Sequence, residues 1–423
     1  MAGLAAAAAT VTVTTATTLE DAGRPQTTRL SLLLGLLAMV GPYSIDAFFP
    51  SLRAIGIDFH VSNLQAQQAL TVYMAPYAFM SLVHGSLSDA LGRRNIVLIA
   101  LCIYIVASIG CALSPTFAIF LLFRFMQGLV AGAGQIVGRA IVRDRFSGAD
   151  AQRLMSVILM IFGLGPALAP VIGGWVHVLL GWRAVFGTMA GFGALLAIMS
   201  WRRLPETHPP EKRTLLELGP LLRHNFMIAR HPEMLLLSVG TGLCFVAITL
   251  YVGSAPAIIL DHWGLTETQF AALTMPIVGG FIISGYLSGR LAGRLAPERQ
   301  ARLGFYTLIA AAGAMVLLQT EVASPPVYAQ QLLLTFTAIG QQLLYPIISL
   351  RVLDLFPQAR GAASSMQSFV SLMFGVIAMG LLAPALSQSM ALLALAAFVC
   401  SVLGWLLCRA SRRYRQLAAM RPA

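Results

Sequence analysis

Long apolar stretches alternate with short polar segments along the chain after residue 28. A helix that crosses a membrane needs about 17–25 predominantly apolar residues. Twelve stretches meet this requirement and predict twelve transmembrane helices. Their expected ranges are 30–52, 66–88, 95–114, 117–141, 153–178, 182–202, 234–256, 268–292, 302–320, 327–349, 362–383 and 389–409.

One polar segment recurs. Gly85–Arg94 (GSLSDALGRR) separates the second and third stretches, and Gly285–Arg294 (GYLSGRLAGR) lies 200 positions later. The two copies share glycine, leucine, serine, leucine and the final arginine at matching positions. A repeated turn of this kind indicates two related halves of one membrane protein. We therefore predict an all-α membrane protein of two pseudo-symmetric six-helix halves.

The longest polar interruption, 204–233, carries Pro205, Pro209 and Pro210 and is expected to link the halves. A short amphipathic helix around Leu215–Ile228 would lie on the membrane surface. The predicted divisions are a disordered cytoplasmic tail over 1–28, the N-terminal half over 29–203, the linker over 204–233, the C-terminal half over 234–409 and a basic cytoplasmic tail over 410–423.

Composition supports a membrane protein and excludes a soluble one. The chain is 58% hydrophobic and 10% charged, whereas soluble domains carry about 25% charged residues. The net charge of +12 comes from arginines scattered between apolar stretches, without a continuous basic face, so nucleic acid is not an expected partner.

The basic residues instead predict orientation. With the N-terminus in the cytoplasm, 25 of the 28 Lys and Arg residues fall on the cytoplasmic side. Only Arg53 and Arg183 fall on the opposite side, and Arg124 lies within a span. Because basic residues are retained in cytoplasmic loops, both termini are expected in the cytoplasm. The Ala- and Thr-rich start has no basic n-region, which argues against a cleaved signal peptide.

Three motifs resemble the major facilitator superfamily. The turn at Gly85–Arg94 resembles its loop motif G-x-L-S-D-R-x-G-R-R, with Ala90 where the family has a basic residue. The fourth span carries Arg124-Phe125-Met126-Gln127-Gly128 and ends in Arg139–Asp144, both similar to family segments. In the fifth span, Gly165–Gly174 resembles the antiporter motif G-x-x-x-G-P-x-x-G-G of drug:proton antiporters of the Bcr/CflA (bicyclomycin/chloramphenicol resistance) type, with Ala169 replacing a glycine.

The turn motif is expected to act as a conformational latch in which Asp89 accepts hydrogen bonds from a neighbouring helix N-terminus and from Arg139 or Arg143. Such a contact would stabilise one of two conformations and break in the other. The alternative is a charged turn that only fixes topology. The latch candidates are Gly85, Asp89, Gly92, Arg93, Arg94, Arg139 and Arg143.

Asp46 is the only acidic residue well inside a predicted span, and Arg124 lies at a similar depth. A charged group inside a membrane is costly and therefore faces a cavity or a partner. We expect the two to interact and Asp46 to carry the transported proton, since burial favours its neutral form and Arg124 its ionised form. The alternative is a permanent ion pair that only orders the helices.

The resemblance implies that spans one, four, seven and ten line a central cavity. Besides Asp46 and Arg124, the candidate cavity residues are Tyr43, Tyr73, Tyr77, Gln127, Tyr251, Gln341 and Tyr345. For each, a hydrogen bond between helices is an equal alternative to substrate contact. The prolines and small residues of the fifth span predict a bent, closely packed helix. The residues of this antiporter bend are Gly165, Pro166, Pro170, Gly173 and Gly174.

The resemblance implies a proton-coupled antiporter that exports drugs or small amphipathic molecules across the bacterial inner membrane by alternating access. It would work as a monomer in the lipid bilayer, with protons and a small-molecule substrate as partners and no cofactor. The alternatives are an exporter or importer of a specific metabolite. An enzyme or receptor is disfavoured because the sequence has no HExxH, GxSxG or phosphate-binding glycine loop and no clustered metal ligands.

Overall fold

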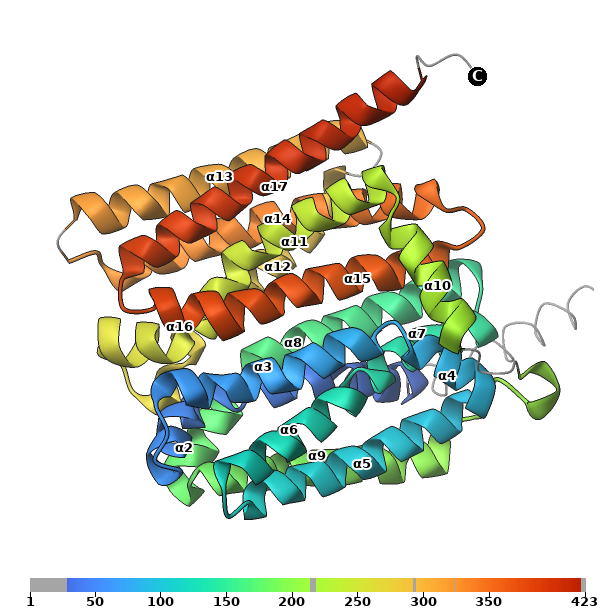
Figure 1. The fold of residues 1–423 in the computed structure, drawn as a ribbon, viewed down its shortest axis with the longest axis horizontal. Coiled ribbons are helices and arrows are strands. Elements are labelled where there is room, and N and C mark those ends of the chain that lie inside the picture. The colour runs from blue at the N-terminus through green and yellow to red at the C-terminus, as the bar shows by residue number, and fades with distance from the viewer. Residues whose placement is uncertain (1–28, 214–217, 292–293, 323, 420–423) are drawn as a thin grey trace, which may run out of the picture.

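Helices make up most of the described chain. The structure is a computed structural model that describes residues 29–213, 218–291, 294–322 and 324–419, and within these residues there is no strand. The long helices lie side by side in one bundle (Figure 1). The short helix α2, Leu52–Asp58, lies at one end of the bundle, and the short helix α4, His84–Leu91, lies at the other. We call these ends the α2 end and the α4 end.

The first half begins with a helix over 29–46, followed by the 3-10 turn η1, Phe49–Ser51, and α2. The remaining helices of this half are α3 (Asn63–Met80), α4, α5 (Arg93–Leu113), α6 (Phe117–Ala131), α7 (Ala133–Arg145), α8 (Gly148–Leu180) and α9 (Trp182–Arg203). Within this half α5 packs on α6 and α9, and α3 packs on α6.

The second half repeats this arrangement of long helices. Its elements are α11 (Pro232–Gly253), η3 (Ala257–His262), η4 (Glu267–Gln269), α12 (Ala271–Leu291), α13 (Pro297–Glu321), α14 (Val327–Leu355), α15 (Arg360–Ile377), η5 (Ala378–Leu382), α16 (Ala383–Leu386) and α17 (Met390–Ala419). Here α13 packs on α14 and α17, and α11 packs on α17. The halves meet through α3 against α15 and α8 against α12.

Local signals in the sequence explain where several helices begin. Ser62 and Gln65 form a capping box at the start of α3, and the Thr116 side chain accepts from the backbone of Ile119 at the start of α6. Gly92 (φ +96°) and Gly181 (φ +82°) adopt positive φ angles that few other residues tolerate. These two glycines allow the chain to turn tightly between α4 and α5 and between α8 and α9.

Eleven stretches of the described residues are long and apolar enough to cross a membrane. The twelfth long helix, α3, is more polar because it carries Gln65, Gln67 and Gln68. Since α3 packs between α6 and α15, protein rather than lipid covers much of its surface (Figure 1). The bundle therefore has the predicted twelve long crossings, six in each half.

Two predicted spans are divided in the structure. The stretch 66–88 is not one helix: α3 ends at Met80, and α4 follows after a turn. The stretch 117–141 is broken at Gly132, which separates α6 from α7 and faces the Tyr77 ring. Apolar length alone predicted both stretches, and it carries no information about such breaks.

The segment between the halves contains the short turn η2, Pro210–Lys212, and the helix α10, Leu218–Ala229. α10 confirms a helix in the region expected around Leu215–Ile228, although residues 214–217 lie outside the described residues. It packs on α15 and α11 at the α4 end (Figure 1). The expected N-terminal tail, 1–28, also lies outside the described residues, whereas the first part of the expected C-terminal tail continues α17 to Ala419.

Candidate functional site

A fully buried arginine lies in the interior of the first half. Arg124 of α6 has no exposed surface. Its Nη1 donates to the Gln127 side-chain oxygen at 2.9 Å and to the Ser44 carbonyl at 3.3 Å. Its Nε donates to the Ala69 carbonyl of α3 at 3.3 Å. The cation is therefore held by carbonyl oxygens from the first helix, α3 and α6.

Aromatic rings complete the surroundings of Arg124. The guanidinium carbon lies 4.4 Å from the ring centroid of Tyr73, 4.8 Å from that of Phe48 and 5.8 Å from that of Phe186. The faces of such rings attract cations, most strongly away from water. Among the described residues, however, Arg124 Nη2 has no hydrogen-bond partner. One donor nitrogen of the buried guanidinium is thus unsatisfied, although carbonyl oxygens and aromatic rings surround the rest of the group.

A hydrogen-bonded network extends from this arginine to α5. Gln127 Nε2 donates to Ser108 Oγ at 2.8 Å, and the hydroxyls of Ser44 and Tyr104 are hydrogen-bonded to each other. All of these side chains are buried. The network was only partly predicted, because serines and a tyrosine among apolar residues give no signal that they will converge on Arg124.

Asp46 is buried in the first helix, with 5% of its surface exposed. The expected pairing with Arg124 is wrong for this conformation, since no ion pair joins the two among the described residues. Residues two positions apart do not share a helix face. Ser44 and Phe48 contact Arg124, so their side of the first helix faces α6. Asp46 is therefore directed away from Arg124. No hydrogen bond joins its side chain to another described residue.

The tyrosines predicted to line a cavity in the first half bond within that half. Tyr73 donates to the Gly41 carbonyl at 3.1 Å, Tyr77 donates to Gln135 at 3.0 Å, and Tyr43 is hydrogen-bonded to Thr188 at 3.1 Å. Each hydroxyl ties one helix of the half to another. Of the predicted cavity residues in this half, the structure brings Tyr73 and Gln127 together around Arg124.

The candidates from the second half lie apart from that cluster. Tyr251 on α11 and Gln341 on α14 are buried. The Tyr251 hydroxyl and the Gln341 side-chain oxygen have no hydrogen-bond partner in the part of the chain that the structure describes. Tyr345 lies one turn beyond Gln341 on α14. Unsatisfied buried polar groups are costly, which makes Tyr251 and Gln341 suitable contacts for a polar ligand.

The turn at Gly85–Arg94 forms a charged network at the α4 end, but with different partners from those expected. Asp89 pairs with Arg93, four residues later, and not with Arg139 or Arg143. Arg93 Nε also donates to Asp144 Oδ2 at 3.1 Å, and its Nη1 donates to Ser88. The expected latch pairing is therefore wrong for this conformation. The Gly92 turn brings Arg93 back over α4, so the turn itself supplies the cation.

The segment after α9 completes this network. The Glu206 carboxylate accepts from the backbone N–H groups of Arg93 at 3.0 Å and Arg94 at 3.3 Å. Thr207 donates to Asp144 at 2.9 Å. A carboxylate at a helix N-terminus satisfies free donors and complements the helix dipole. Glu206 therefore caps α5 and fixes the start of the linker to the first half.

The glycines of the antiporter-like segment lie where α8 approaches its neighbours. A side-chain carbon added at Gly173 would collide with the Ala47 carbonyl, directly after the first helix, and one added at Gly174 would collide with the Glu267 carbonyl of η4. One added at Gly165 would press on Met39. Pro166 and Pro170 lie within the continuous helix. This segment therefore brings α8 against both halves.

A second contact between the halves lies at the α2 end. Arg53 of α2 donates to Asp261 of η3 at 3.3 Å, with both side chains more than half exposed. Sequence analysis missed this pair because it joins residues 208 positions apart. Among the described residues there is no group of three or more His, Cys, Asp or Glu side chains that could hold a metal ion.

An all-helical membrane bundle of two six-helix halves, with a buried arginine and a buried aspartate, has the architecture of a secondary transporter. The chain matches the model of the Major Facilitator Superfamily over residues 32–379. It therefore belongs to the major facilitator superfamily, and it is a transport protein rather than an enzyme.

The chain is similar to several bacterial proteins. It is 32% identical over 299 residues to the uncharacterized MFS-type transporter YdgK of Bacillus subtilis (strain 168), covering 70% of this chain and 74% of that one. A bicyclomycin resistance protein homolog of Haemophilus influenzae is 26% identical over 346 residues, covering 82% and 86%. The multidrug resistance protein MdtL of Escherichia coli O45:K1 is 28% identical over 333 residues, covering 78% and 82%. These relatives confirm the resemblance to the Bcr/CflA type.

Solved structures confirm the fold. The crystal structure of a D-xylose-proton symporter superposes with a TM-score of 0.70 at 13% sequence identity, covering 89% of this chain and 97% of that one. A bacterial homolog to the human lysosomal transporter Spinster superposes with a TM-score of 0.68 at 17% identity, covering 93% and 98%. The predicted arrangement of two six-helix halves is thus confirmed.

Proposed function

We propose that this transporter is a proton-coupled antiporter that exports drugs or other small amphipathic molecules. It works by alternating access in the bacterial inner membrane, as a monomer without a cofactor, and both termini are cytoplasmic. The basic residues support this orientation, because 25 of the 28 fall on one side of the predicted topology. The similarity to resistance proteins supports drugs as substrates.

The observation that carries the proposal is Asp46. It is buried within a membrane-spanning helix, and no cation among the described residues is paired with it. An ionisable group at such a position is a functional candidate, because leaving it there is otherwise costly. Because no cation of the described residues is paired with this carboxyl, it can take up and release a proton as its access to the two sides alternates.

Arg124 has a different role in this proposal. Its cage of carbonyls and aromatic rings fixes the packing of the first helix, α3 and α6 without neutralising Asp46. A permanent ion pair between the two would have left no free proton carrier. Because Ser44 contacts Arg124 and lies two residues before Asp46, a shift of the first helix would alter the surroundings of both groups together.

The test is proton movement in energised inside-out vesicles that contain the wild type or Asp46→Asn. Chloramphenicol, a fluoroquinolone and a cationic dye are added in turn, and the pH gradient is followed with a fluorescent probe. An exported compound should dissipate the gradient with the wild type. With Asp46→Asn, the gradient should persist, because the amide cannot carry a proton.

Collapse of the gradient with both proteins would disprove Asp46 as the carrier and leave export standing. If no compound disturbs the gradient with the wild type, drug export is wrong and a specific metabolite is the better substrate. Asn95→Asp serves as a control for a charge change of equal size, because Asn95 lies on the exposed surface of α5 and hydrogen-bonds only to the Leu91 carbonyl.

A further inference from the structure

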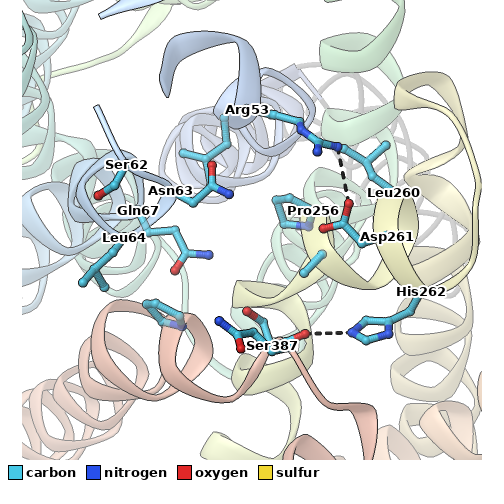
Figure 2. A pocket seen from close by; sticks show the side chains of 14 residues that line it. Arg53, Ser62, Asn63, Leu64, Gln67, Pro256, Leu260, Asp261, His262 and Ser387 are labelled. Carbon is cyan, nitrogen blue, oxygen red and sulfur yellow. Dashed lines mark hydrogen bonds and ion pairs between the residues drawn. The ribbon is translucent and has the colours of Figure 1, made fainter. Parts of the chain in front are cut away.

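A pocket opens between the halves at the α2 end of the bundle. Its volume is about 540 Å³, within the range of about 300–1,000 Å³ typical of small-molecule sites. Asn63 and Gln67 of α3 line it from the first half (Figure 2). Asp261 and His262 of η3 and Ser387, next to α16, line it from the second half. None of the predicted central-cavity residues contributes to this pocket.

One lining side chain has an unmet requirement for a hydrogen bond. Gln67 has only 7% of its surface exposed, and its side-chain oxygen accepts no hydrogen bond from any described residue. Figure 2 shows the amide directed into the pocket between the two halves. A buried amide oxygen without a hydrogen bond costs free energy that a bound donor would recover. The position of Gln67 therefore points to a ligand.

The charges of the pocket select against an ionic ligand. Arg53 and Asp261 pair with each other at 3.3 Å, so their charges offset one another. His262 Nε2 is hydrogen-bonded to the Ser387 carbonyl at 2.8 Å. The groups that remain available include the amides of Asn63 and Gln67 and that of Gln388.

An amide both donates and accepts hydrogen bonds, so these groups suit a ligand with amide or hydroxyl groups and no net charge. Leu52, Leu64, Leu260 and Pro384 supply apolar walls for the rest of such a molecule. We propose that this pocket is a binding site for a neutral, amide- or hydroxyl-bearing amphipathic molecule.

The pocket lies at one end of the interface between the halves. Thr71 lies one turn beyond Gln67 on the same face of α3 and abuts Gly380 of η5 in the second half. Its buried hydroxyl also has no hydrogen-bond partner among the described residues. Polar groups in need of partners thus continue from the pocket into the interface. In the proposed topology the α2 end faces away from the cytoplasm. The pocket is then the last site that an exported molecule occupies, a role that rests on the proposed function.

The test is protection of a cysteine in the pocket from a membrane-impermeant maleimide. Leu64→Cys is labelled in right-side-out vesicles without a pH gradient, with the wild type giving the background. Chloramphenicol, which is neutral and carries an amide and hydroxyls, should slow labelling about tenfold at ten times its dissociation constant, because only about one pocket in eleven is then empty. Ethidium, a permanent cation, should give no protection. The control Thr320→Cys, on α13 outside the pocket, should be labelled equally fast with either compound.

A second variant tests the role of Gln67. Gln67→Leu in the Leu64→Cys background should raise the concentration of chloramphenicol needed for protection about fivefold, as expected for one neutral hydrogen bond. Gln319→Leu, the same change on α13, should leave the concentration of chloramphenicol needed for protection unchanged. Because the Gln67 oxygen has no partner without ligand, Gln67→Leu should not lower the unfolding temperature.

Absence of protection by chloramphenicol, or equal protection by ethidium, would overturn the proposed site. An unchanged concentration dependence in Gln67→Leu would also overturn it. Labelling requires no proton gradient, so this result is independent of the vesicle experiment. Protection without export would leave the binding site standing and disprove only the proposed function, whereas export without protection would disprove only the site.

Discussion

The pair of Arg93 and Asp144 allows a quantitative test of the network at the α4 end. The Arg93 side chain is 8% exposed and that of Asp144 24%, with 3.1 Å between Nε and Oδ2. Hydrogen bonds to charged groups stabilise proteins by about 1.5–3 kcal/mol when buried, whereas exposed ion pairs contribute about 0.2–1 kcal/mol. Because Asp144 is partly open to solvent, we expect a coupling energy of about 1.5 kcal/mol, at the lower limit of the buried range.

The coupling is measured with a double-mutant cycle of Arg93→Gln, Asp144→Asn and the double variant. The free energy of unfolding is obtained in mixed micelles with rising sodium dodecyl sulfate, followed by tryptophan fluorescence. The matched control is the double-mutant cycle of Arg93 with Asp89. The Asp89 side chain is 40% exposed, and Asp89 precedes Arg93 by four residues in the same turn motif. That pair should couple by less than about 1 kcal/mol and weaken with added salt.

The decisive result is which of the two pairs has the larger coupling energy. A coupling of Arg93 with Asp144 no larger than that with Asp89 would refute the argument that burial determines the strength of this network. It would also mean that Asp144 is held in place chiefly by Thr207, whose hydroxyl donates to the same carboxylate oxygen.

Two further predictions concern contacts of the membrane-embedded helices. Gly173→Ala should lower the free energy of unfolding by about 1–3 kcal/mol because the added methyl group meets the Ala47 carbonyl. The control Gly163→Ala should be neutral or stabilising, because its added methyl group meets no described atom within 4 Å. Equal unfolding temperatures of the two variants would contradict this prediction. Cross-linking of Arg53→Cys to Asp261→Cys with a cleavable bis-maleimide should stop transport, and cleavage should restore it, because alternating access separates the halves. Transport by the cross-linked protein at the rate of the uncross-linked variant would show that this end does not open.

Eleven of the twelve crossings could be predicted because each supplies enough apolar length to span the lipid, whatever its neighbours are. The twelfth, α3, is more polar, and neighbouring helices cover much of its surface. The partners of buried charged groups were harder to predict. Arg124 was assigned to Asp46 because both charges lie at similar depth, but backbone carbonyls and aromatic rings hold the arginine instead. Every residue has a carbonyl, so no sequence pattern identifies the ones that a cation will use. Which groups contact Arg124 depends on how the first helix is rotated about its own axis.

The same limit applies to contacts between distant segments. Asp89 was expected to bind an arginine of the fourth span, whereas the Gly92 turn gives it Arg93 as a partner. Sequence analysis connected neither Arg53 with Asp261 nor Gln67 with a pocket, since both depend on how the two halves meet. The motif in α8 did predict close packing, because small residues at regular spacing have a direct steric meaning.

The cap of α5 by Glu206 also bears on the biogenesis of the protein. Glu206 follows Arg93 by 113 residues in the chain, so the turn between α4 and α5 is synthesised well before the carboxylate that satisfies its N–H groups. While the third to sixth spans are being inserted, this turn must rely on water or lipid headgroups for its hydrogen bonds. Only a nascent chain that has released the residues after α9 from the ribosome can finish the first half. Completion of that half thus coincides with the emergence of the start of the linker from the ribosome.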